Sequence, residues 1–364
     1  MNARPLRIGI RAETANVEVQ TGIERYAKQL ILHLAALDPV NHYVLYLRRQ
    51  PQPWLLELPE NFSVRVVPAP FAWTTVRLAV ELRRDRIDRF LALNYKAPVF
   101  KGRSSVVTIH DLAFLHYPEL ERWLYRWLLP LRIRAAARRA RAVITVSRST
   151  ACDLVRLEPR LAGQVHIVPH GYERTSGADD ARALPAEVPD RYVLYLSSVH
   201  PKKNVGRLID AFVSLKRDLP HLPQQLVLAG QAGWNSEAIL AQIAAHSDIV
   251  TYLGYVDDST RSALYQHADL YVLPSLTEGF GLGVLEAFDA GTPVAVSRAM
   301  SLPEVAGDAA VYFDPLDIKD IAAAMGSVLT DEALRTQLIS SGTARLADFS
   351  WERCARQTLE VLEL

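Results

Sequence analysis

Short runs of β-branched and aromatic residues alternate along the whole chain with segments whose apolar residues recur at helical spacing. The runs with the character of buried strands are 6–11, 43–48, 63–68, 105–109, 142–147 and 165–169, then 192–197, 224–230, 249–254, 269–275, 293–297 and 310–313. Helical patterns lie between them, for example over 22–36, 204–218, 235–246, 281–290 and 317–347. This alternation predicts parallel sheets with helices on both faces.

A polar segment separates the two halves of the chain. Residues 173–190 are rich in Ala, Asp and Pro and show no strong periodicity, which is typical of a linker. A chain of 364 residues is also too long for one ordinary hydrophobic core. We therefore predict an α/β protein with domains over 1–172 and 191–350. These would be two doubly wound, Rossmann-like domains that face each other across a cleft.

The composition is that of a globular protein and argues against several classes of function and location. Apolar residues make up 49% and charged residues 22%, which argues against a disordered chain. A net charge of +1 argues against bulk binding of nucleic acid. Its two cysteines, Cys152 and Cys354, suit a reducing compartment better than a disulfide framework. No signal-peptide pattern and no run of ~20 apolar residues is present, so we expect a cytoplasmic protein, or one peripheral on the inner face of the plasma membrane.

The polar residues that directly follow the strands are the candidate site residues, because ligands of open parallel sheets bind beyond the carboxyl ends of the strands. No strand is followed by the full dinucleotide fingerprint, and the chain contains no P-loop and no CxxC pair. A nicotinamide enzyme and a P-loop phosphotransferase are thus disfavoured. No Asp-x-Asp or histidine cluster with ligand spacing stands at a strand end, so we expect no metal site.

The stretch TEGFGLGVLEAF, residues 277–288, contains two glutamates around a glycine-rich turn. The glycines let backbone amides approach a ligand, and the helix that they open points its partly positive end at a natural diphosphate site. Glu278 precedes that helix and Glu286 lies inside it, so the two need not converge as a hydrolase pair. The alternative is that Glu278 complements the helix dipole and Glu286 belongs to a solvated face.

Two further strand ends carry candidate chemistry. Lys202 and Lys203 follow the first strand of the second half, with Asn204 as a helix cap. A cation there could neutralise charge on a departing phosphate, or the pair could be a solvated charge run. His110 ends the strand over 105–109, where it could be catalytic or a structural hydrogen-bonding group.

A basic segment and a short capping motif complete the candidates. Residues 121–142 combine seven arginines with Trp123, Tyr125 and Trp127, as in helices that lie on anionic membranes. The alternative is a packed helix with a solvated arginine face. The sequence SLPE, residues 301–304, fits a capping box.

Taken together, these motifs resemble the retaining family-4 glycosyltransferases, which have the GT-B fold. The resemblance covers nearly the whole chain and is most specific in EGFGLGVLEA. Other matching stretches are TGIERYA, VVTIHDLAFLHYPE, ITVSRST, VPHG, HPKKN, LAG, LGYVDD, PVAVS and FSWERCARQTLEVL. In appearance the chain is closest to bacterial mannosyltransferases of surface-polysaccharide biosynthesis.

The resemblance implies a role for each matching residue. The catalytic group would be His110, Lys203 and Glu278. The donor-binding group would be Gly22, Lys202, Lys203, Gly230, Gly254, Tyr255, Val256, Gly279, Phe280, Gly281, Leu282 and Glu286, with no metal. Within these groups, Glu278 would bind sugar hydroxyls, Glu286 the ribose and Lys203 the diphosphate. Many members have an arginine where this chain has Ser197, and Lys202 is the candidate to compensate.

The resemblance also implies the reaction. The chain would transfer a hexose from a nucleotide-sugar, most simply mannose from GDP-mannose, to a glycan or lipid-linked acceptor, with retained configuration and without a cofactor. The terminal helix, 351–364, would cross back onto the first domain. A UDP-hexose donor, a sugar-nucleotide epimerase that needs no acceptor, and a non-catalytic sugar-nucleotide binder remain as alternatives.

Overall fold

A computed structural model describes residues 4–18, 22–69, 71–98, 104–120, 123–174 and 184–364, with the side chains of 123–125 excepted. Residues 175–183 of the expected linker and 121–122 of the basic segment therefore lie outside the description. The chain divides into two compact units, one formed by 1–171 with 349–364 and the other by 172–348. Each unit is described by itself below.

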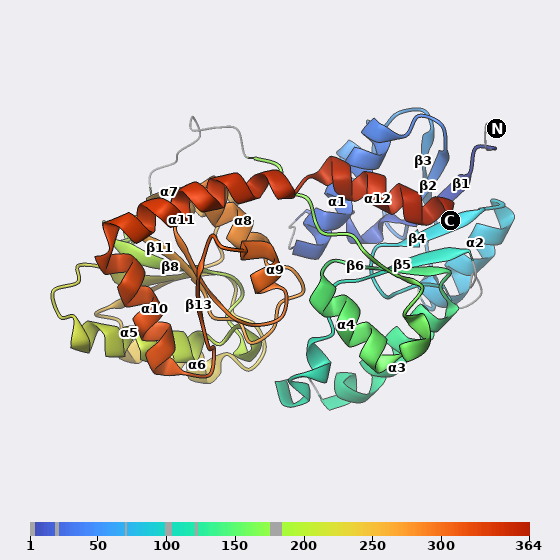
Figure 1. Ribbon diagram of the computed structural model, residues 1–364. Coiled ribbons are helices and arrows are strands. Elements are labelled where there is room, and N and C mark those ends of the chain that lie inside the picture. The colour runs from blue at the N-terminus through green and yellow to red at the C-terminus, as the bar shows by residue number, and fades with distance from the viewer. Residues whose placement is uncertain (1–3, 19–21, 70, 99–103, 121–122, 175–183) are drawn as a thin grey trace. The chain divides into compact units, whose positions relative to one another are not determined.

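The N-terminal unit is built on a parallel sheet that has seven strands within the described residues, in the order β3-β2-β1-β4-β5-β6-β7 (Figure 1). The strands are β1 (Arg7–Arg11), β2 (His42–Leu47), β3 (Phe62–Val66), β4 (Arg89–Ala92), β5 (Ser105–Ile109), β6 (Ala142–Thr145) and β7 (Val165–Ile167). The helices are α1 (Gly22–Leu37), α2 (Leu78–Arg84), α3 (Trp123–Arg139), α4 (Arg148–Leu157) and α12 (Trp351–Glu363).

The two faces of this sheet bury separate apolar clusters, because successive residues of a strand point to opposite faces. Tyr43 and Leu45 pack in the cluster that contains residues of α1 and α12. Their neighbours Val44 and Tyr46 pack in the cluster that contains residues of α2, α3 and α4. Helix α12 thus belongs to the N-terminal unit, where it contacts α1 (Figure 1).

The C-terminal unit repeats this plan. Its described residues form a parallel six-stranded sheet in the order β10-β9-β8-β11-β12-β13. The strands are β8 (Tyr192–Leu196), β9 (Gln225–Ala229), β10 (Val250–Gly254), β11 (Leu270–Leu273), β12 (Val294–Ser297) and β13 (Val311–Phe313). The helices are α5 (Val205–Asp218), α6 (Glu237–Ala245), α7 (Asp258–His267), α8 (Leu282–Asp289), α9 (Leu302–Ala306), α10 (Ile318–Thr330) and α11 (Glu332–Arg345). Two parallel α/β domains are therefore confirmed.

Two details of the expected elements are wrong. The helical pattern over 317–347 is two helices, because Asp331 leaves the helical conformation and its carboxylate accepts a hydrogen bond from the amide of Leu334 at 3.0 Å, which starts α11. The strand β4 was not expected, because it is only four residues long and directly follows a run of charged residues. Phe90, Leu91 and Ala92 are nevertheless fully buried in the centre of the sheet.

Among the helices that the structure describes, none is long and apolar enough to cross a membrane.

The carboxyl end of β9 requires a glycine, and this can be tested. Gly230 has φ +133°, and a Cβ there would lie 2.0 Å from the carbonyl oxygen of Ser197. Gly254 has φ +66°, but a Cβ there would meet no atom within 4 Å. We expect Gly254→Ala to lower the free energy of unfolding by about 1 kcal/mol. Gly230→Ala should cost more than about 3 kcal/mol, since backbone strain and overlap add. Urea unfolding of both variants measures the difference, and equal losses would contradict the close approach at Gly230.

Candidate functional site

The strongest candidate site lies where the strand order of the C-terminal sheet reverses. The chain builds β8, β9 and β10 outward in one direction and then returns to place β11 on the other side of β8. Ligands of open parallel sheets bind at such a reversal, beyond the carboxyl ends of the two strands. Lys203 follows β8 and Glu278 follows β11. The topology therefore brings together two residues that lie 75 positions apart in the sequence.

Lys203 and Glu278 form an ion pair. The Lys203 ammonium donates to Oε1 of Glu278, and the hydroxyl of Ser275 donates to the same oxygen at 2.8 Å. The two charged side chains are only 17% and 14% exposed. Lys203 is therefore not part of a solvated charge run, and the Glu278 carboxylate is held in one orientation by two donors.

The loop that carries Glu278 is fixed through its backbone. The hydroxyl of Ser301 donates to the carbonyl oxygens of Glu278 at 2.9 Å and Phe280 at 3.0 Å. The expected capping box is thus wrong: Ser301 precedes α9, but its side chain makes no cap hydrogen bond, because it is committed to this loop. Gly281, at φ +103°, ends the loop, and Leu282 begins α8.

Asn204 joins the segments that follow β8 and β11. It was expected to cap the next helix, but it makes no cap hydrogen bond and has φ +60°. Its amide nitrogen instead donates to the carbonyl oxygens of Pro274 at 3.1 Å and Pro315 at 2.7 Å. In addition, the amide of Leu276 donates to the carbonyl oxygen of Lys202 at 2.9 Å. The turn after β8 is therefore tied to the loop after β11.

His200 is a residue of this turn that the sequence patterns did not single out. Burial lowers its pKa to about 4, and the positive charges of Lys203 and Lys202 act in the same direction. Its ring stacks on Trp234 with centroids 6.3 Å apart. Since the ring is neutral near pH 7, it adds no further positive charge to the turn. Its position immediately before the proline and the two lysines was the one available signal.

Glu286 lies on α8, one to two turns after the glycine loop. Its side chain is 14% exposed, so it does not belong to a solvated face. Nε of Arg261, on α7, lies 3.7 Å from its carboxylate. Burial lowers the pKa of Arg261, whereas Glu286 and Asp258 raise it, and the net direction is upward. Glu286 is therefore a largely buried glutamate that lies beside an arginine.

The remaining donor-site candidates of this unit cluster at the ends of β9 and β10. The amide of Gly230 donates to the carbonyl oxygen of Gly254 at 2.6 Å, which joins the two strand ends. Tyr255 follows with 56% of its surface exposed. Val256 is partly buried, as is Gly279, which lies apart from this cluster in the loop after β11.

In the N-terminal unit, His110 follows β5 and is 9% exposed. Its Nε2–H donates to the carbonyl oxygen of Leu93 at 2.9 Å, and its ring packs edge-on against Tyr26 with centroids 4.9 Å apart. Burial lowers its pKa, so the ring is neutral near pH 7. The contact with Leu93 is structural, but His110 also lines a cavity of about 420 Å³. Gly22, the other candidate of this unit, begins α1 and is exposed.

No group of three or more His, Cys, Asp or Glu residues with the arrangement of a metal site occurs in the described part of the chain.

Comparison with solved structures shows the class of the fold. Sucrose-phosphate synthase from Thermosynechococcus elongatus superposes with a TM-score of 0.78 at 22% identity, over 98% of both chains. Anabaena HepE in complex with UDP and glucose gives a TM-score of 0.73 at 18% identity, over 98% of this chain and 99% of the other. These neighbours are GT-B glycosyltransferases, so the two units have the GT-B fold.

Family models then identify the chain. Residues 20–175 match the model Glycosyltransferase Family 4, and residues 178–345 match Glycosyl transferases group 1. The chain therefore belongs to the glycosyltransferases that carry these two domains. A curated relative, O-antigen chain mannosyltransferase B of Escherichia coli, is 28% identical over 94% of this chain and 96% of its own length. The expected resemblance to bacterial mannosyltransferases of surface-polysaccharide assembly is confirmed.

Proposed function

We propose that this glycosyltransferase moves mannose from GDP-mannose to a glycan or lipid-linked acceptor in the biosynthesis of a cell-surface polysaccharide. The largely buried pair of Lys203 and Glu278 at the reversal of strand order carries the proposal, because it offers a cation and a carboxylate side by side. A sugar diphosphate needs both, one for its phosphate and one for its hydroxyls. Mannose is favoured by the mannosyltransferase that matches nearly the whole chain, and GDP is the carrier that the sequence resemblance implies.

In the proposed donor complex, the diphosphate binds the ammonium of Lys203, and sugar hydroxyls donate hydrogen bonds to the carboxylate of Glu278. The amides of residues 279–282 face the phosphate and the sugar at the start of α8. Glu286 accepts hydrogen bonds from the ribose. The ion pair of the free protein thus opens, and each partner receives a ligand group in exchange.

The proposed chemistry is transfer with retained configuration. The bond between the anomeric carbon and the phosphate oxygen breaks, and the acceptor oxygen attacks the same face of the sugar. The proton of the acceptor passes to the departing phosphate. Glu278 orients the sugar in this scheme, since two donors already occupy one of its oxygens. Lys203 stabilises the charge that grows on the leaving phosphate.

The donor can be tested by thermal shift. A ligand at 100 times its Kd stabilises the folded state by about 2.7 kcal/mol. We expect GDP-mannose to raise the melting temperature more than UDP-glucose or ADP-glucose, and excess EDTA to leave both this shift and transfer unchanged. A larger shift with UDP-glucose would favour the UDP-hexose alternative.

Loss of transfer in EDTA that Mg²⁺ restores would contradict metal-independent transfer. An isomeric sugar nucleotide formed without acceptor would identify an epimerase, and binding without any turnover would leave only a binder.

Lys203 should act mainly in the transition state. We expect Lys203→Met to lower kcat about a hundredfold or more, because one preorganised electrostatic donor is lost. Single-turnover transfer from labelled donor measures this effect, with Lys202→Met as the matched control and the milder variant. A kcat near that of the wild type would contradict the catalytic role and show that the ion pair of Lys203 and Glu278 is only a structural contact.

The same variant leaves the Glu278 carboxylate without its cation, so stability must be separated from catalysis. We expect Lys203→Met to cost about 1–3 kcal/mol in the free energy of unfolding. Adding Glu278→Gln should recover most of this loss but none of the activity. A double-mutant cycle of unfolding and kcat therefore distinguishes the two roles.

We further propose that α3 makes peripheral contact with an anionic membrane. Trp127 and Leu131 lie one helical turn apart and are 65% and 61% exposed. Not all of its arginines are available: Arg138 pairs with Glu158 at 2.5 Å, and Arg134 donates to the carbonyl oxygen of Leu157 at 3.0 Å. The contact would therefore depend on the exposed apolar pair together with the remaining basic residues.

Vesicle sedimentation tests this contact. Trp127→Ser with Leu131→Ser should weaken binding to vesicles of phosphatidylglycerol and phosphatidylcholine by about tenfold, since roughly 1.4 kcal/mol or more of apolar burial is lost. Salt should weaken the binding of the wild type. Leu56→Ser, at a side chain that is 67% exposed on another element, is the control and should have no effect. Equal binding by all three proteins would rule out the contact.

A further inference from the structure

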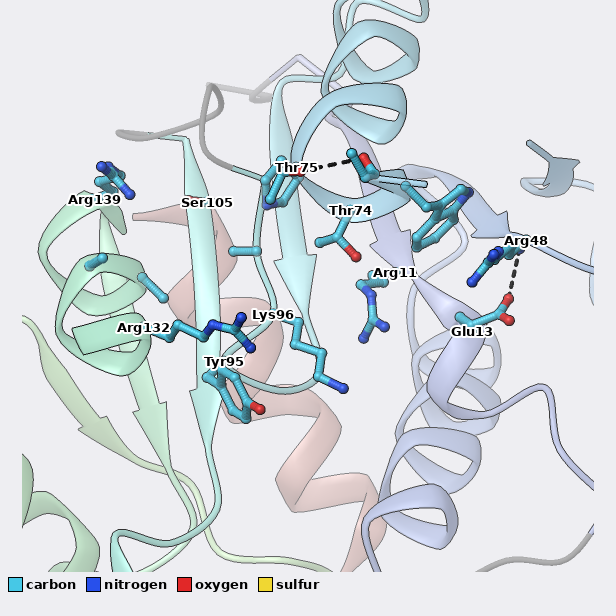
Figure 2. A pocket seen from close by; sticks show the side chains of 16 residues that line it. Arg11, Glu13, Arg48, Thr74, Thr75, Tyr95, Lys96, Ser105, Arg132 and Arg139 are labelled. Atoms are coloured by element: carbon cyan, nitrogen blue, oxygen red, sulfur yellow. Dashed lines mark hydrogen bonds between the residues drawn. The ribbon is translucent and has the colours of Figure 1, made fainter. Parts of the chain in front are cut away.

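The N-terminal unit has a second reversal of strand order. Its sheet reverses order between β1 and β4, just as the C-terminal sheet does between β8 and β11. Arg11 is the last residue of β1, and Lys96 lies four residues beyond the end of β4. A cavity of about 510 Å³ opens between these strand ends and α3 (Figure 2). We call it the basic cavity.

Charge distinguishes this cavity from its surroundings. Among the described residues that line it, the basic ones are Arg11, Arg48, Lys96, Arg132 and Arg139, and the acidic one is Glu13. Figure 2 shows Arg11 and Lys96 pointing toward the same space, with Arg132 reaching in from α3. The carboxylate of Glu13 already accepts a hydrogen bond from the backbone amide of Arg48 at 2.7 Å. The lining therefore carries an excess of positive charge.

Arg11 is preorganised and has a donor to spare. It is 8% exposed, and its Nη1 donates to Thr14 and to Asn94, each at 3.2 Å. Its Nε is buried and has no hydrogen-bond partner among the described residues. A buried donor without a partner destabilises the folded protein, so a ligand acceptor here would be favoured.

Mutual repulsion points to the same conclusion. Burial lowers the pKa of Lys96, and the positive charges of Arg11 and Arg132 lower it further. Burial also lowers the pKa of Arg11. An anion placed between these groups would relieve both the repulsion and the cost of burial.

We propose that the basic cavity binds a phosphoryl group, a phosphate or diphosphate ester, that forms part of the acceptor. Guanidinium groups fit phosphate oxygens through paired hydrogen bonds, and several cations around one space suit a dianion better than a single carboxylate. The inference rests on the proposed function, in which the N-terminal unit receives the acceptor.

The neighbouring cavity supplies room for the sugar of that acceptor. It shares Arg11, Glu13, Tyr95 and Lys96 with the basic cavity, so the two spaces adjoin. Its other polar lining residues are His110, Asp111, Glu24, Thr14 and Asn94, which offer mostly acceptors for hydroxyl groups. An acceptor could therefore be anchored by its phosphoryl group while a sugar hydroxyl lies beside His110.

Calorimetric titration with inorganic pyrophosphate tests the basic cavity. The full-length Lys203→Met protein is used so that the proposed donor site does not contribute. We expect one site, and Lys96→Met or Arg132→Gln added to this background should raise Kd about tenfold or more, as for the loss of a charged hydrogen bond. Lys28→Met, at a lysine of the same unit that lines neither cavity, is the matched control and should leave Kd unchanged. No binding, or equal Kd values for Lys96→Met and Lys28→Met, would overturn the proposal.

Competition then identifies the source of the phosphoryl group. Decyl diphosphate displaces pyrophosphate more strongly than mannose 6-phosphate if the natural acceptor is lipid-linked, and the reverse order indicates a soluble sugar phosphate. Displacement by neither compound overturns the proposal. These titrations contain no sugar nucleotide, so their failure is distinguishable from a failure of the GDP-mannose thermal shift.

Discussion

Reversal of strand order in a parallel sheet is the constraint on which the rest of this structure depends. At the reversal, two adjacent strands send their connections to opposite sides, and their carboxyl ends are left open to a ligand. The C-terminal unit places Lys203 and Glu278 at this point, and the N-terminal unit places Arg11 and Lys96 there. Both charged groups are therefore consequences of chain order rather than of local sequence.

Holding charges at such a point requires support from uncharged neighbours. In the C-terminal unit, Ser301 and Asn204 donate to carbonyl oxygens of the 274–280 loop, while Ser275 donates to the Glu278 carboxylate itself. These side chains satisfy buried polar groups that an open turn would otherwise leave without partners. These hydrogen bonds constrain the loop, and preorganisation of this kind would lower the cost of binding the proposed donor.

Features that depend on local sequence patterns could be predicted from the sequence, whereas features that depend on the topology of the sheets mostly could not. Alternation and composition were enough to place the start of all twelve expected strands within one residue of an observed strand. Ser301 and Asn204 look like helix caps in sequence, but their partners lie 21 to 111 positions away, so no local motif could reveal them. Lys203 and Glu278 were predicted because their strands were recognised. Arg11 and Lys96 were missed because β4, which brings them together, is four residues long and follows a run of charges.

The pair of Lys203 and Glu278 and the basic cavity differ in the ligands that they would select. Lys203 is already neutralised by Glu278, so a phosphate that binds the lysine leaves a largely buried carboxylate without its cation unless the ligand brings hydroxyl groups as well. A sugar nucleotide supplies both, whereas free phosphate supplies one. The basic cavity has an excess of cations over carboxylates among its described lining residues, so a phosphoryl group alone is enough to satisfy it. Under the two proposals, the C-terminal unit would discriminate by the sugar and the N-terminal unit by charge.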